Sequence, residues 1–156
     1  MSPHPDLHSY LGDFFRARIL RATGLRLRRL ESLETALHDC IETECDDLLS
    51  PDALTLVRLE RELDPGCALA RMSPVTLLPA VLRRFLTWIP ADATNRRLQL
   101  QILAAILKAA LADRGLVDRE DRLVFTIDAL TLDADIAEYR KDFERERRAL
   151  AALPQS

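Results

Sequence analysis

Apolar positions recur every three or four residues along most of the chain, and this spacing predicts helices. The clearest start is Ser50-Pro51-Asp52, with an N-cap serine, a proline in the first helical position and an acid in the first turn. The sequence predicts an all-α fold, an irregular bundle of six or seven helices that forms a single helical domain over residues 1–156. Helix breaks are expected near Gly24, Ser50, Asp64–Gly66, Pro90, Gly115 and Thr131–Asp133.

The stretch from Leu98 to Leu111 is apolar on nearly all sides of a helix, so we expect it at the centre of the bundle. It is too short to cross a bilayer, and Gln99, Gln101 and Lys108 interrupt it. Residues 124–127 are β-prone, but a lone strand would have no partner, so a helix is favoured there too.

Composition and cysteine spacing indicate the cellular compartment. Hydrophobic residues make up 48% of the chain and charged residues 30%, which is typical of a globular protein. The three cysteines, Cys40, Cys45 and Cys67, lack the spacing of a motif and fit reduced thiols. The first twenty residues show no signal-peptide pattern. We therefore expect a cytoplasmic protein without membrane insertion.

Charge is distributed in blocks along the chain, although the net charge is only −3. Residues 1–30 are basic, 31–64 strongly acidic, 65–117 basic and 118–156 mildly acidic. We expect the N-terminal arginines to pair with the acidic segment 31–64. If they face solvent on one side instead, they become candidate contacts for nucleic acid: Arg16, Arg18, Arg26, Arg28 and Arg29. A second, smaller basic cluster contains Arg83, Arg84, Arg96 and Arg97.

Catalytic motifs are missing from the sequence. It holds no phosphate-binding loop, no G-x-G-x-x-G and no G-x-S-x-G, and only 4 glycines in all. The best metal candidate is one helix face with Glu34, His38, Glu42 and Cys45. A carboxylate-bridged di-iron bundle needs Glu-x-x-His on two helices, and this spacing is not present. We therefore expect no catalytic residue, no metal and no cofactor.

The last predicted helix, about residues 133–153, is amphipathic with a narrow apolar seam. Its members are Ile136, Tyr139, Phe143 and Leu150, with Glu146 in the remaining seam position, and most other positions are charged. A stripe of two residues in seven indicates packing along a single line. The seam either packs on the chain's own bundle or binds a partner, and we take these four residues as the candidate partner-binding site.

These patterns favour a non-catalytic protein–protein interaction module, an adaptor or small subunit of a bacterial complex that binds another protein. Because Glu146 interrupts the seam, a different protein is favoured over a second copy. One alternative is a helical nucleic-acid-associated regulator or a small subunit of a nucleoprotein complex. A further alternative is a metal-dependent helical-bundle enzyme.

Overall fold

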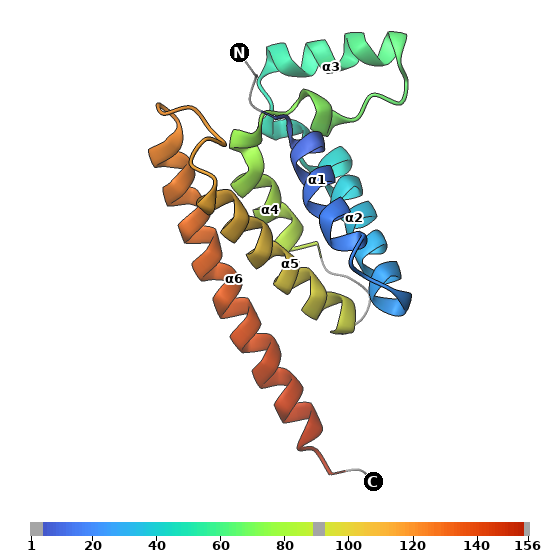
Figure 1. Cartoon of the computed structure of the whole chain (residues 1–156), viewed down its shortest axis with the longest axis vertical. Coiled ribbons are helices and arrows are strands. Elements are labelled where there is room, and N and C mark those ends of the chain that lie inside the picture. Colours follow the sequence, from blue (N-terminus) through green and yellow to red (C-terminus); the bar gives the residue numbers. More distant parts are fainter. Residues whose placement is uncertain (1–4, 89–92, 155–156) are drawn as a thin grey trace.

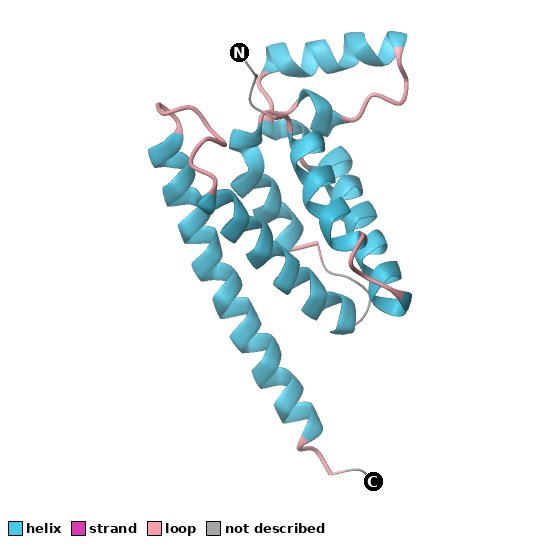
Figure 2. Cartoon of the chain, viewed as in Figure 1, coloured by secondary structure: helices cyan, strands magenta, loops and turns pink. Residues whose placement is uncertain are grey.

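The computed structural model describes residues 5–88 and 93–154, and the predicted all-α fold is confirmed. The described residues form six α-helices and no strand (Figure 2). Short 3-10 turns lie at Asp46–Leu48, Leu69–Met72 and Val75–Leu77. The helices are α1 (Leu7–Ile19), α2 (Gly24–Glu44), α3 (Pro51–Leu63), α4 (Leu78–Leu86), α5 (Ala93–Ala112) and α6 (Arg122–Ala151).

Local capping explains most of the helix boundaries. Asp6 caps α1 by accepting the Ser9 amide at 2.8 Å, and Ser50 caps α3 by accepting the Ala53 amide at 3.2 Å. Gly24 opens α2 with φ of 59°, a left-handed conformation that glycine adopts without strain. The predicted breaks near Gly24, Ser50, Asp64–Gly66 and Gly115 are thus confirmed, whereas Pro90 lies outside the described residues.

The predicted break at Thr131–Asp133 is wrong, because α6 is one helix of 30 residues. The Thr131 hydroxyl donates a hydrogen bond to the Ile127 carbonyl at 2.8 Å, which lets the threonine stay within the helix. The last predicted helix, residues 133–153, is therefore the second half of a longer one.

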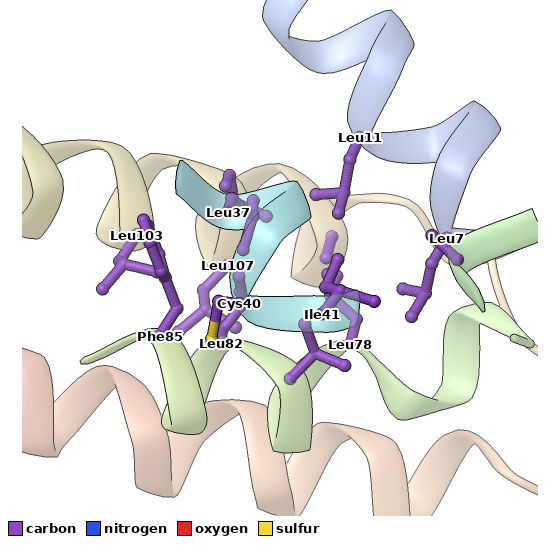
Figure 3. Close-up of a cluster of buried hydrophobic side chains, with 14 of the residues drawn as sticks. Leu7, Leu11, Leu37, Cys40, Ile41, Leu78, Leu82, Phe85, Leu103 and Leu107 are labelled. Carbon is purple, nitrogen blue, oxygen red and sulfur yellow. The ribbon is translucent and has the colours of Figure 1, made fainter. Parts of the chain in front are cut away.

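The core lies between α1, α2, α4, α5 and the first half of α6, and Figure 3 shows part of it. Figure 3 shows Leu11 from α1, Leu37 from α2, Leu82 from α4 and Leu103 from α5 gathered in one cluster. The predicted central stretch is the core-forming part of α5, in which Leu103, Ile106 and Leu107 are fully buried. In Figure 1, α3 stands off at one end of the molecule and α6 continues past α5 at the other.

Arginines of the second basic cluster fasten the helices to one another. Arg84 binds both carboxylate oxygens of Asp47 at 2.7 Å, which ties α4 to the segment after α2. Arg83 pairs with Asp135 at 2.7 Å and Arg97 with Glu144 at 3.4 Å, so α4 and α5 both hold α6. These arginines therefore bind carboxylates of the chain itself.

Candidate interaction surfaces

Helix α6 has apolar residues on two opposite faces. One face carries Phe125, Ala129, Leu132 and Ile136, all buried in the core. The other carries Leu123, Ile127 and Leu130, which are 70%, 53% and 54% exposed. Ile127 and Ile136 are nine residues apart, which at 3.6 residues per turn places them on opposite sides of the helix.

We call the exposed stripe the outer face of α6, defined by Leu123, Ile127 and Leu130. The exposed Ala134 continues it for another turn. Two exposed acids, Asp128 and Asp133, lie near its edges, and neither forms an ion pair within the described parts of the chain. By contrast, the nearby Asp135 pairs with Arg83. The outer face thus combines apolar surface with unneutralised negative charge.

The seam predicted from the sequence begins in the core and ends in solvent. Ile136 is 1% exposed and belongs to the chain's own core, and Phe143 is half-buried against it. Tyr139 is 42% exposed, with the Arg96 guanidinium 5.4 Å from its ring centre, and Leu150 is 69% exposed. The structure therefore leaves mainly the end of the seam open, and binding of a partner there stays a prediction.

The structure does not bring the five candidate nucleic-acid arginines together. Arg16 lies 3.7 Å from Asp13 on its own helix. Arg18 and Arg26 line one surface pocket with Arg21, whereas Arg29 lines another with Phe85 and Trp88. Arg28 lies two residues beyond Arg26, about 200° further around α2. Within the described residues, no ion pair joins any of the five to segment 31–64. Arg16 nevertheless acts electrostatically on Glu34, whose pKa it lowers against the larger effect of burial.

The side chains of the predicted metal-ligand face have different partners in the structure. Glu42 accepts the Leu69 amide and pairs with Arg61 at 2.6 Å. The His38 ring instead faces His8 of α1, with ring centres 5.5 Å apart. Burial lowers the pKa of His38 and raises that of Glu34. Within residues 5–88 and 93–154, no three candidate ligands gather in a geometry that could hold a metal ion.

All three cysteines are free and buried. Cys45, which the sequence placed on the metal-ligand face, is 3% exposed and lies in the core cluster.

Comparison with known proteins finds no family model, curated protein or solved structure that matches this chain. Among the helices described, none has the length and apolar character needed to cross a membrane.

Proposed function

We propose that this protein is a non-catalytic protein–protein interaction module, an adaptor or small subunit whose outer α6 face binds a helix of another protein. One observation carries the proposal: α6 is apolar on two opposite faces, and the described residues cover only one of them. Removing a leucine or isoleucine side chain from water contributes about 1.5–3 kcal/mol, so three such residues give a partner a substantial gain. The exposed end of the seam, at Leu150, extends the surface available to a partner.

The charge beside the outer face selects the kind of partner. Asp128 and Asp133 are exposed and unpaired within the described residues, so a helix with basic flanks complements them. A second copy of the chain would present the same exposed acids, whereas a basic helix would neutralise them, so a different protein is favoured over a homodimer. The partner that fits is an amphipathic helix with apolar residues at i, i+3 or i+4, and i+7, flanked by arginine or lysine.

Three free, buried thiols suit a reducing compartment, so we place this function in the cytoplasm. Nucleic-acid association has weaker support, because only two of the five candidate arginines line one pocket, and the chain has a net charge of −3. A metal-dependent enzyme has still weaker support, since Glu42 is engaged by Arg61 and the Leu69 amide, and no three candidate ligands gather within the described residues.

Affinity purification from the native cell tests the proposal with three forms of the full chain: wild type, Ile127→Asp and Leu20→Asp. Leu20 is an exposed leucine in the turn after α1, so Leu20→Asp is the matched control. We expect wild type and Leu20→Asp to retain one protein in stoichiometric amount, and Ile127→Asp to lose it. The segment of that protein protected on binding should be a basic amphipathic helix.

Two outcomes would contradict the proposal. In the first, Ile127→Asp retains the same protein in the same amount as wild type. In the second, the only chain that associates with the wild type is another copy of itself, as measured by light scattering.

A further inference from the structure

Arg18, Arg21 and Arg26 converge on one surface pocket where α1 ends and α2 begins. The pocket has a volume of about 340 Å³, and its other described lining residues are uncharged: Phe14, Ala17, Ala22 and Leu30. We propose that this pocket binds the phosphate group of a small phosphorylated ligand. The site is independent of the outer α6 face.

These three arginines differ from the four that tie elements of the fold together. Arg61, Arg83, Arg84 and Arg97 each pair with a carboxylate of another element. In the described parts of the chain, the pocket arginines pair with none, and Arg18 instead lies over the Phe14 ring at 4.7 Å. Three like charges around one pocket repel one another, and a bound anion would neutralise them.

The start of α2 adds a second unfavourable charge arrangement. Its N-cap, Thr23, forms no side-chain capping hydrogen bond, and its first turn contains no acid. Arg26 lies in that first turn, although the N-terminal end of a helix is its positive end. A cation there costs stability in the free protein, whereas a phosphate in the pocket would interact favourably with both the arginine and the helix end.

The arrangement favours phosphate on a small molecule. Guanidinium groups donate paired hydrogen bonds, and a tetrahedral phosphate offers enough oxygens to accept from several of them at once. The apolar lining around Phe14 suits the remainder of such a ligand. An extended nucleic acid would need a continuous basic track, but Arg28 and Arg29 do not line this pocket.

Isothermal titration of the full chain with phenyl phosphate, inorganic phosphate and benzoate tests the assignment. Phenyl phosphate should bind saturably and more tightly than inorganic phosphate, and benzoate should bind more weakly than either. Arg21→Gln and Arg26→Gln should each weaken phenyl phosphate by about tenfold or more. Arg28→Gln is the matched control on α2 and should leave the affinity unchanged.

The assignment fails if neither phosphate compound binds saturably, or if Arg28→Gln weakens binding as much as Arg26→Gln does. A single-stranded DNA oligonucleotide is a further arm of the experiment. If the oligonucleotide binds, and its binding depends equally on Arg26, Arg28 and Arg29, the surface is a nucleic-acid contact and the small-ligand assignment is overturned. Each of these results leaves the α6 proposal standing, since none of these arginines lies near the outer face.

Discussion

At the scale of single residues, Arg26 shows how a side chain can oppose stability where it serves a ligand. Its charge lies at the positive end of α2 beside Arg18 and Arg21. In phosphate-free buffer, Arg26→Gln should therefore raise the free energy of unfolding by about 0.3–1 kcal/mol. Urea denaturation measures this gain. A clear loss of stability would show that Arg26 has a structural role that the pocket does not explain.

His38 gives the stability a dependence on pH. Its ring is half-buried against His8 of α1, with Asp39 and Glu42 of its own helix nearby, and burial lowers its pKa below the ordinary 6.5. The unfolded chain binds a proton at this histidine more readily than the folded chain does. The contribution of His38 to the free energy of unfolding is therefore fully present above about pH 6.5 and is lost as the pH falls below it. When the pH is lowered through 6.5, the free energy of unfolding should fall less for His38→Gln than for wild type. Chemical denaturation of both proteins above and below pH 6.5 measures this difference. Equal losses would contradict the assignment.

At the scale of elements, Gln99 joins the end of α4 to the start of α5. It is fully buried, and its amide nitrogen donates to the carbonyls of Phe85 and Trp88, each at 2.7 Å. Gln99→Leu would leave both carbonyls without this donor and should cost at least about 1–3 kcal/mol. Gln101→Leu, two residues along α5 and only half-buried, should cost much less. Chemical denaturation of the two variants compares them directly.

The sequence predicted helix ends well where the signal was local, as at the Asp6 and Ser50 caps. It failed at Thr131, because a threonine that bonds back to its own helix resembles one that ends a helix. This false break separated Ala134 from the three residues that define the outer face of α6. The breaks predicted near Gly115 and Thr131–Asp133 confine Leu123, Ile127 and Leu130 to a short element, although their spacing with Ala134 is helical. The arginine pocket could not be predicted, since it depends on how α1 and α2 meet at Gly24.

At the scale of the whole molecule, substitutions of two isoleucines on opposite sides of α6 distinguish an effect on folding from an effect on binding. Ile136→Asp puts an unpaired charge into the core and should remove most of the few kcal/mol that hold such a chain together. Ile127→Asp changes an exposed position and should alter stability by about 0.5 kcal/mol or less. Thermal unfolding followed by circular dichroism distinguishes them. Unfolding of both variants would show that the outer face supports the chain's own fold.

Photo-cross-linking from position 127 of the full chain, carried out in the native cell, tests the central claim most directly. A photoreactive residue at 127 should form a cross-link to one other protein, within a basic amphipathic helix of that protein. The same residue placed at the exposed position 20 should not capture it. No cross-link from position 127, or a cross-link that joins two copies of this chain, would contradict the account.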